Sequence, residues 1–386
     1  MNILYLAHNL DDSAIWRRVA MLQRGGATIA VAGFRRGVGA LAQQAVVLGQ
    51  THNSKLLERA GTVLRTLPRI ADKLTQAGVP DPDVIIARNL EMLVLGRALL
   101  RRYPAARLVY ELLDVHRLML GSSFASRALR QVEGYLMRHC ALVLISSPGF
   151  EDMYLRPNFS RVPPTMLIEN KPFATPDLRL DRAPARTPGG PIVIGWSGIL
   201  RCAWSLEELD RITRAAPGRY RVLLRGKPAL DVVPEFHKIV AANPDMTFGG
   251  AYQWPRDLAE VYGPCDLSWL IDRYEADGNS EWLLPNRLYE GGLFGAVPIA
   301  LASNQLGRRL VALDCGLLAA DPEAVQPMLA ALTPEDIERA RAEVTGLPRS
   351  TWLADDEDCR ALTDAIARAH LRPGRSRQDN AEEVIS

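Results

Sequence analysis

The sequence predicts an α/β protein built from two doubly wound domains. Short apolar runs alternate with amphipathic segments along most of the 386 residues, which is typical of strand–helix–strand units in a parallel sheet. The alternation stops at a segment rich in proline and glycine, residues 173–190, and then starts again. At roughly 150 residues per domain, the length also allows two to three domains. We therefore expect two domains joined by a linker at 173–190.

The first domain is expected over residues 1–172. Each of its strands is predicted from an apolar run that ends in a polar loop, with a helical pattern after it. The predicted strands are residues 2–7, 27–34, 83–88, 106–114 and 141–147, and the predicted helices are near residues 15–22, 90–102 and 126–139. Because the strands are apolar throughout, we expect helices on both faces of the sheet.

The second domain is expected over residues 191–350. Its predicted strands are residues 191–198, 219–226, 246–251, 265–271 and 296–302. A C-terminal helix, 351–371, can return to the first domain, and the polar tail 372–386 is expected to be disordered. Ligands of doubly wound sheets bind at the carboxyl ends of the strands, so a cleft between two facing domains is the expected site.

Composition limits the classes of function. The 46 basic and 44 acidic residues nearly cancel, which argues against a protein whose main partner is nucleic acid. Five scattered cysteines without CxxC spacing indicate neither a disulfide framework nor a structural zinc site, and a reducing compartment fits best. The N-terminus lacks the basic region of a signal peptide, and no apolar run approaches the roughly 18 residues that span a bilayer. We therefore expect a cytoplasmic protein.

The most informative segment is residues 284–300, LPNRLYEGGLFGAVPIA. Pro285 ends a loop, a short helix carries Glu290, and Gly295 allows the turn into the next strand. The start of such a helix presents free N–H groups to a phosphate, and a carboxylate one turn later can accept two hydrogen bonds from a ribose diol. The residue types alone leave open a structural alternative, in which Glu290 only favours the positive end of the helix.

This segment resembles the donor-nucleotide motif of the GT-B glycosyltransferases. The resemblance is strongest to the family 4 (group 1) enzymes of exopolysaccharide assembly, of the succinoglycan type, whose pattern is LPNK-LYE, a hydrophobic residue, x-x-G and x-PVIA. It extends over the C-terminal half and more loosely over the N-terminal half. It implies two Rossmann-like domains that face each other across a cleft. It also implies transfer of a sugar from a nucleoside diphosphate to an acceptor hydroxyl.

The resemblance also implies which residues hold the donor. Glu290 would bind the ribose. Gly198 and Arg201, after the first strand of the second domain, would approach the diphosphate. Arg225 and Lys227 follow another strand, and these basic groups could converge on a pyrophosphate in place of a divalent ion. Ordinary solvated charges remain the alternative for Arg201 and Lys227. The expected donor site is Gly198, Arg201, Arg225, Lys227, Tyr252, Asn286, Arg287, Leu288 and Glu290.

The stretch from 249 to 270 also matches the family, as a strand, a helix, Y-x-x-x-D and a strand. In related enzymes Tyr252 would lie near the base, whereas Tyr262 and Asp266 are expected to be structural. Many members carry a further glutamate where this chain has Trp282, and Glu281 is one residue out of register. This departure leaves both retaining and inverting chemistry open.

Two candidate catalytic residues follow a strand of the first domain. Asp114 and His116 lie in YELLDVHRL, and carboxylate and imidazole are the usual general bases. In an inverting enzyme we favour Asp114 as the base, whereas a retaining enzyme would use His116 mainly to position the sugar. Capping of the next helix by Asp114 is the alternative. Residues after the other strands are expected to line the acceptor site: His8, Asn9, Asp12, Arg88 and Asn89.

The expected partners are a nucleotide sugar and a saccharide or polyprenyl-diphosphate-linked saccharide acceptor. We expect no cofactor or metal, and a UDP-sugar as donor rather than a GDP-sugar. The acidic run 356–358 is interpreted as the start of a helix. The basic amphipathic segment 56–76 is interpreted as a solvated face, because Pro68 interrupts its helix. Peripheral contact with the inner face of the plasma membrane is the alternative.

Two other functions fit the same architecture. A sugar-nucleotide epimerase would release its product without an acceptor, so an assay without acceptor separates it from a transferase. A non-catalytic protein that binds sugar nucleotides would be supported by the Trp282 departure and contradicted by measurable donor hydrolysis.

Overall fold

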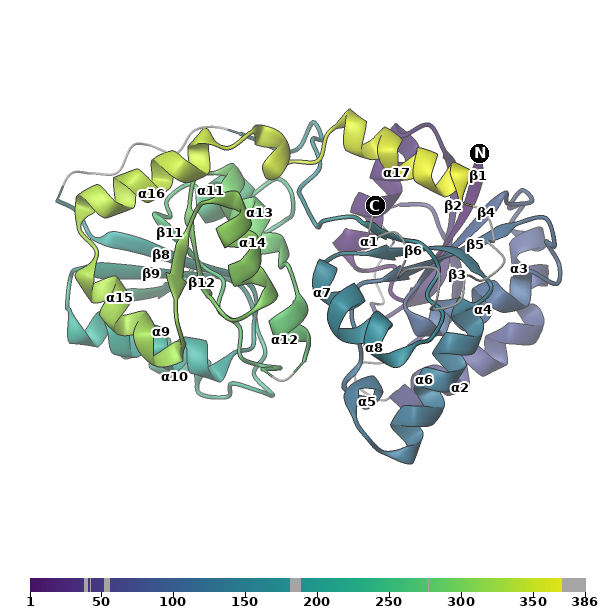
Figure 1. Ribbon diagram of the computed structural model, residues 1–386, viewed down its shortest axis with the longest axis horizontal. Coiled ribbons are helices and arrows are strands. Elements are labelled where there is room, and N and C mark those ends of the chain that lie inside the picture. The colour runs from purple at the N-terminus through teal and green to yellow at the C-terminus, as the bar shows by residue number, and fades with distance from the viewer. Residues whose placement is uncertain (38–40, 42, 52–55, 181–188, 277, 370–386) are drawn as a thin grey trace, which may run out of the picture. The chain divides into compact units, whose positions relative to one another are not determined.

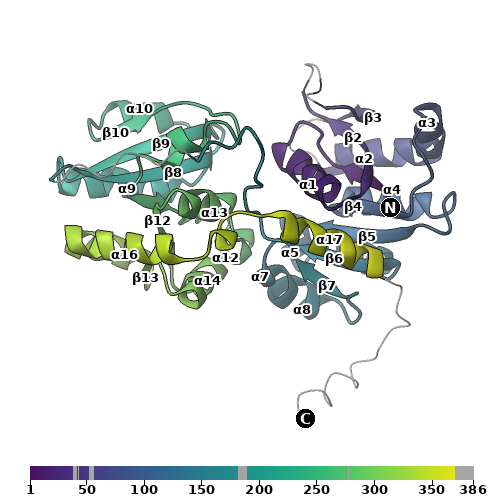
Figure 2. The same ribbon diagram turned by 90° about the horizontal axis from the view of Figure 1, so that it is seen from above.

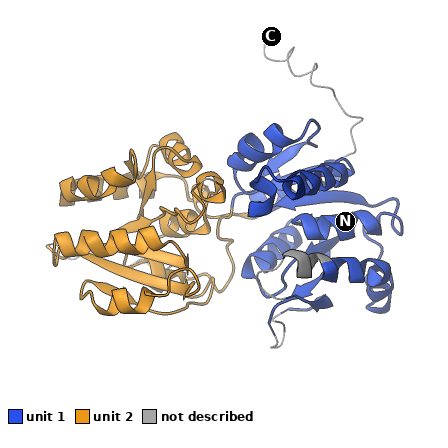
Figure 3. Ribbon diagram, turned by 90° about the horizontal axis from the view of Figure 1, so that it is seen from below, with its two compact units in different colours: residues 1–169, 356–386 blue, residues 170–355 orange. Residues whose placement is uncertain are grey.

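A computed structural model describes residues 1–37, 41, 43–51, 56–180, 189–276 and 278–369. The chain forms two compact units (Figure 3). Unit 1 contains Met1–Glu169 and Asp356–Ser386, and unit 2 contains Asn170–Asp355. The predicted fold class of two doubly wound α/β domains is confirmed. The C-terminal helix belongs to unit 1, whereas the predicted tail 372–386 lies outside the described residues.

Unit 1 contains a parallel sheet of seven strands in the order β3-β2-β1-β4-β5-β6-β7. The strands are β1 (Asn2–Ala7), β2 (Thr28–Arg35), β3 (Val46–Gln50), β4 (Val84–Arg88), β5 (Arg107–Leu112), β6 (Cys140–Ile145) and β7 (Thr165–Leu167). The order reverses direction at β1, so loops after β1, β4 and β5 meet at one edge of the sheet.

Helices pack on both faces of this sheet (Figure 1). They are α1 (Ser13–Arg24), α2 (Leu56–Thr66), α3 (Ile70–Gln76), α4 (Leu90–Leu99), α5 (Arg117–Leu120), α6 (Phe124–Met137), α7 (Pro148–Phe150), α8 (Arg156–Asn158) and α17 (Asp356–Arg368). A π-helix, Glu151–Leu155, joins α7 to α8, and a 3₁₀ turn that contains Pro68, Leu67–Arg69, joins α2 to α3.

Helix α17 packs against the C-terminal end of α1, and this contact attaches it to unit 1 (Figure 2). At Gly25 a Cβ atom would lie only 2.4 Å from the carbonyl oxygen of Cys359, so only glycine allows this approach. The hydroxyl of Thr363 donates to the carbonyl of Gly25 at 2.9 Å, and Arg24 forms an ion pair with Asp356 at 2.8 Å. The acidic run 356–358 therefore opens a helix, as the sequence predicts.

Unit 2 contains a parallel sheet of six strands in the order β10-β9-β8-β11-β12-β13. The strands are β8 (Ile192–Leu200), β9 (Tyr220–Pro228), β10 (Met246–Phe248), β11 (Leu267–Trp269), β12 (Val297–Leu301) and β13 (Leu317–Ala319). The helices are α9 (Ala203–Ala215), α10 (Phe236–Ala241), α11 (Leu258–Tyr262), α12 (Asn279–Trp282), α13 (Asn286–Leu293), α14 (Gln305–Leu313), α15 (Val325–Ala331) and α16 (Pro334–Gly346). Two 3₁₀ turns, Pro322–Ala324 and Arg349–Thr351, complete the unit.

The structure differs from the sequence prediction at short elements. Strands β3, β7 and β13 were not predicted, because runs of three to five residues carry too little periodicity to identify a strand. The first part of the predicted linker 173–190 packs within unit 2, where Phe173 bridges to Ala354 and Leu178 is buried. Among the described residues, no helix is both long and apolar enough to cross a membrane.

Candidate active site

The carboxyl ends of β8 and β9 extend side by side and carry the first donor candidates. Gly198 pairs with Gly226, and both have positive φ angles, 107° and 132°. A Cβ atom on Gly226 would lie 1.9 Å from the carbonyl oxygen of Gly198, so this close pairing requires glycine. Gly198 therefore lies within β8 and not in the turn after it, which corrects the sequence prediction.

Arg225 and Lys227 lie within β9 and not beyond it, which is a second correction. Being two residues apart on one strand, they project to the same face. Lys227 is exposed, whereas Arg225 is half-buried and packs on Gly249. The buried Nε atom of Arg225 has no hydrogen-bond partner among the described residues. An anion at this face would supply the missing acceptor.

Arg201 and Arg287 gather around Asp272 at the carboxyl ends of β8 and β11. The carboxylate of Asp272 lies 3.8 Å from Arg201 Nε and 4.0 Å from a terminal nitrogen of Arg287. The Arg201 guanidinium stacks on the ring of Tyr274 at 4.6 Å, and Arg287 donates to the carbonyl of Leu270. Two expected donor residues are thus brought together, and Asp272 is a member of this cluster that sequence reasoning missed.

The first turn of α13 contains the expected residues Asn286, Arg287 and Leu288. Helix α13 begins after Pro285, which makes no side-chain cap, so the N–H groups of the first turn are not satisfied by a capping side chain. The side chain of Leu288 lies in the core of unit 2, and its N–H donates to the carbonyl of Pro285. Leu288 therefore offers no free group to a ligand, contrary to the sequence prediction.

Glu290 lies on the buried side of α13, with only 3% of its surface exposed. The hydroxyl of Tyr262 donates to Glu290 Oε2 at 2.8 Å. Burial raises the pKa of Tyr262 well above its ordinary value, so this hydroxyl stays protonated and remains a donor. Tyr252 packs against the cluster that contains Tyr262, and burial together with the charge of Glu290 raises the pKa of its hydroxyl. Tyr262, from outside α13, thereby orients the carboxylate and acquires a supporting part in the site.

Two other predictions concern residues near this edge. Asp266 is structural, as predicted, because it accepts from the N–H of Val193 at 2.8 Å and pairs with Arg341 at 2.8 Å. Glu281 and Trp282 lie on α12, directly before the donor segment.

The acceptor candidates of unit 1 occupy the loops at the switch point of its sheet. His8 and Asn9 follow β1 and are half-buried, and the side-chain oxygen of Asn9 accepts from the N–H of Asp11. Asp12 caps α1 by accepting from the N–H of Ala14 at 2.9 Å. The loop is thus held by its own polar side chains.

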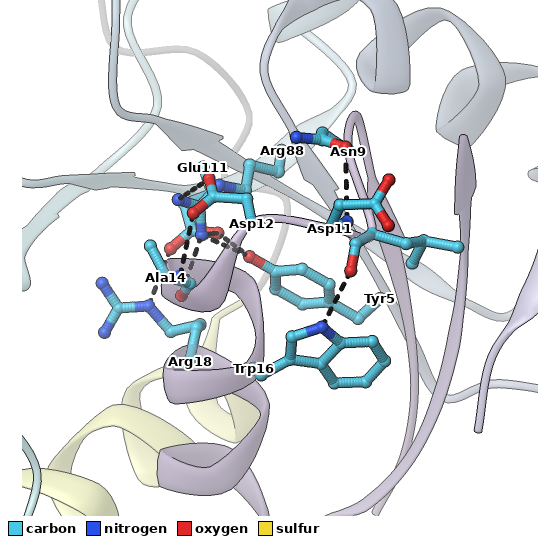
Figure 4. A network of polar contacts seen from close by, with 10 residues as sticks. Tyr5, Asn9, Asp11, Asp12, Ala14, Trp16, Arg18, Arg88 and Glu111 are labelled. Atoms are coloured by element: carbon cyan, nitrogen blue, oxygen red, sulfur yellow. Dashed lines mark hydrogen bonds and ion pairs between the residues drawn. The ribbon is translucent and has the colours of Figure 1, made fainter. Parts of the chain in front are cut away.

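A buried ion network lies directly beneath this loop (Figure 4). Arg18 Nε donates to Glu111 Oε1 at 2.7 Å, and the hydroxyl of Tyr5 donates to Glu111 Oε2. Arg88 donates to the Tyr5 hydroxyl at 3.1 Å and lies 3.8 Å from carboxylate oxygens of both Glu111 and Asp12. The only sequence signal for this network was a glutamate inside the apolar strand β5.

Arg88 and Asn89 end β4 side by side but are placed differently. Arg88 is 5% exposed and belongs to the network, so it supports the loop from below and does not line the acceptor site as predicted. Asn89 has a positive φ angle of 69°, and its buried Oδ1 atom has no hydrogen-bond partner among the described residues. The Oδ1 atom of Asn89 can therefore still accept a hydrogen bond, as expected of a residue that lines the site for the acceptor saccharide.

Asp114 and His116 are both exposed in the loop between β5 and α5. His116, and not Asp114, caps the next helix, because its Nδ1 atom accepts from the N–H of Leu118 at 3.2 Å. In neutral imidazole the proton must then be on Nε2. The alternative in which Asp114 caps the next helix is therefore wrong, whereas the catalytic roles of Asp114 and His116 stay predictions.

Comparison with known proteins shows the family through one relative, although no family model matches the sequence. Succinoglycan biosynthesis protein ExoL of Rhizobium meliloti (strain 1021) is 40% identical over 383 residues, which cover 96% of this chain and 94% of ExoL. Sucrose-phosphate synthase of Thermosynechococcus elongatus superposes with a TM-score of 0.67 at 16% identity and covers 96% of both chains. HepE of Anabaena in complex with UDP-glucose superposes with the same TM-score at 17% identity, covering 96% of this chain and 100% of HepE.

Two Rossmann-like units, each built on a parallel sheet, define a protein of the GT-B fold. Within that fold, the chain belongs to the family of succinoglycan biosynthesis protein ExoL. The resemblance drawn from residues 284–300 is confirmed.

Proposed function

We propose that this protein transfers a sugar from a UDP-sugar to a saccharide hydroxyl during exopolysaccharide assembly. The observation that carries the proposal is Glu290, a buried carboxylate oriented by Tyr262 on the helix that follows the donor loop. Membership of a family named for succinoglycan biosynthesis supports the pathway, and the UDP-glucose bound to HepE supports the class of donor.

The donor would bind at the edge of unit 2 that carries the basic cluster. Glu290 would accept hydrogen bonds from the ribose diol, and Tyr252 would lie beside the base. Arg225 and Lys227 on β9 and the N-terminus of α13 would bind the diphosphate. As the bond between the sugar and the diphosphate breaks, these groups would stabilise the charge that develops on the leaving group.

The acceptor would bind to the loops of unit 1. In an inverting transfer, the acceptor oxygen attacks the anomeric carbon while its proton passes to the carboxylate of Asp114 and the UDP group departs. The Nε2–H group of His116 would donate a hydrogen bond to a sugar oxygen. Asn89 would hold a neighbouring hydroxyl through its Oδ1 atom.

We expect UDP-glucose or UDP-galactose to raise the thermal unfolding midpoint by a few degrees at concentrations about a hundredfold above Kd, because a ligand that binds only the folded state stabilises it. GDP-mannose should produce no comparable shift. Differential scanning fluorimetry with these three nucleotides tests the donor class. A shift with GDP-mannose alone, or with none of them, would contradict the proposal.

Replacing Asp114 with Asn should lower kcat about 10²- to 10⁴-fold while the Kd for UDP-glucose stays unchanged, because only proton removal is lost. His116→Asn is the matched variant, since asparagine also caps helices. It should reduce kcat much less than Asp114→Asn. Release of UDP, measured with lipid-linked saccharides extracted from an exopolysaccharide-producing bacterium, provides the rates. The reverse order of the two effects would assign the base to His116.

We also propose a lipid-linked acceptor and a location at the inner face of the plasma membrane. Family membership supports the acceptor class, because a growing exopolysaccharide chain requires a carrier. Of the basic segment 56–76, Lys73 donates to the carbonyl of Leu48 and Arg65 donates to the carbonyl of Gly61. These cations are therefore partly engaged by backbone, which weakens that segment as the membrane contact.

A further inference from the structure

We propose that a basic pocket on unit 1 binds the anionic headgroups of membrane phospholipids. The pocket has a volume of about 490 Å³ and lies between α6 and the residues that follow α8. Its lining includes four arginines and two aromatic residues: Arg127, Arg130, Arg138, Arg161, Tyr135 and Phe159. No residue of the site described above takes part in it.

The charge of the pocket is uncompensated. Its lining contains no carboxylate, and Arg127, Arg138 and Arg161 form no ion pair within the described part of the chain. Arg130 is fixed in place because it donates to the carbonyls of Met119 and Gly121. Three exposed guanidinium groups and one held by backbone carbonyls line the same pocket, and they suit the oxygens of a phosphodiester, which accept paired N–H donors.

The acidic side chain of Glu133, on the same helix, is turned into the interior of unit 1. Glu133 is 1% exposed and accepts from the hydroxyls of Tyr110 and Tyr154 in the interior. Burial raises the pKa of Glu133 above its ordinary value. Of the arginines that line the pocket, only Arg130 acts on this carboxyl group, whose pKa it lowers in part. The charges of Arg127, Arg138 and Arg161 therefore keep the pocket positive.

Exposed apolar side chains accompany the arginines on the same helix. Phe124 is 80% exposed and Tyr135 is 56% exposed. Helical spacing places Phe124, Arg127, Tyr135 and Arg138 along one stripe of α6. Val132, on a neighbouring row, is 47% exposed.

This combination favours a membrane over a phosphate in solution. Arginines alone would bind a free phosphate, but large aromatic side chains beside them would then remain in water without benefit. At a bilayer, the aromatic rings enter the boundary between headgroups and acyl chains while the arginines contact the phosphates. The charge of anionic lipids complements the four arginines.

The position of the stripe connects it to the proposed reaction. Helix α5 begins at Arg117, directly after the loop with Asp114 and His116, and α6 follows from Phe124. Contact of α6 with a membrane would bring this loop close to a lipid-linked acceptor. This consequence rests on the proposed function, whereas lipid binding itself requires neither donor nor acceptor.

The test is co-sedimentation of the full chain with vesicles. The wild-type protein should bind vesicles of phosphatidylcholine mixed with phosphatidylglycerol and not vesicles of phosphatidylcholine alone. The triple variant Arg127→Ala, Arg138→Ala, Arg161→Ala should bind the mixed vesicles about a hundredfold more weakly, since each arginine contributes about fivefold at an anionic surface. Phe124→Asp, at a fully solvated position, should also weaken binding at least tenfold without changing the unfolding midpoint.

The matched control is the triple variant Arg65→Ala, Arg69→Ala, Arg101→Ala, which removes the same charge from other exposed positions of unit 1. It should lose less than about threefold in binding if the pocket is specific. Equal losses in the two triple variants would overturn the proposal, and so would vesicle binding that Phe124→Asp leaves unchanged. If inorganic phosphate bound to these arginines and the protein did not bind mixed vesicles, the pocket would be assigned to a soluble phosphate. Transfer activity measured with detergent-solubilised acceptor should be unaffected, which separates this test from that of the proposed function.

Discussion

Replacing Glu290 with Ala should weaken UDP-sugar binding at least about a hundredfold, because hydrogen bonds to a charged group are each worth about 1.5–3 kcal/mol and two would be lost. The same change removes the acceptor of the buried Tyr262 hydroxyl, so some loss of stability is also expected. Isothermal titration calorimetry with UDP-glucose measures the first effect, and thermal unfolding followed by circular dichroism measures the second.

Tyr262→Phe separates the two contributions. It removes the hydroxyl that orients Glu290 but leaves the carboxylate in place, so it should weaken donor binding by less than about tenfold. Glu290→Gln preserves the shape and one acceptor oxygen and should give an intermediate affinity. If Glu290→Ala bound UDP-glucose as tightly as the wild-type protein, the carboxylate would be a structural element of α13 and the donor site would have to lie elsewhere.

Replacing Glu111 with Gln should destabilise unit 1 by about 3–5 kcal/mol, the usual cost of removing one partner of a buried ion pair. Arg18 would lose its hydrogen-bonded carboxylate, while Arg88 would keep the carboxylate of Asp12 and its hydrogen bond to Tyr5. Urea titration followed by tryptophan fluorescence measures the loss. Adding Arg18→Met to this variant should recover part of the stability, because no unpaired guanidinium is then left buried.

The same residue gives an expected pH dependence. Burial alone would raise the pKa of Glu111, but Arg18, Arg88 and the Tyr5 hydroxyl together hold it below its ordinary value. A depressed pKa in the folded state stabilises the protein above the pKa of the unfolded chain, about 4.3, and the stabilisation is lost as pH falls below that value. Glu111→Gln should abolish this part of the acid sensitivity.

Asp364→Asn, which breaks an exposed ion pair with Arg368 on α17, is the matched control for Glu111→Gln. It should change stability by less than about 1 kcal/mol, since exposed pairs contribute little. Equal effects of the two substitutions would show that the buried network contributes no more to the stability of unit 1 than an exposed ion pair does.

The regular strands and the donor helix could be predicted because their signals are local. Strands β1, β4, β5 and β8 are apolar runs long enough to identify, and the motif at 284–300 places Glu290 on a helix within a few residues. The placement of Gly198, Arg225 and Lys227 inside strands could not be predicted. Pairing of β8 with β9 continues past the apolar run only because Gly198 and Gly226 tolerate close contact, and that depends on both strands together.

Hydrophobic periodicity is a property of neighbouring residues, so the order of the two parallel α/β units and the residue types at the ends of their strands follow from the sequence. Which of those side chains are buried in polar networks and which stay accessible depends on contacts between distant segments of the chain. The tertiary structure placed Arg88 under the loop, gave His116 the cap of α5, and oriented Glu290 through Tyr262. The physical reason is separation along the chain. Tyr5 and Glu111 share a hydrogen bond across 106 residues, and no local pattern records which distant side chain completes a buried polar group.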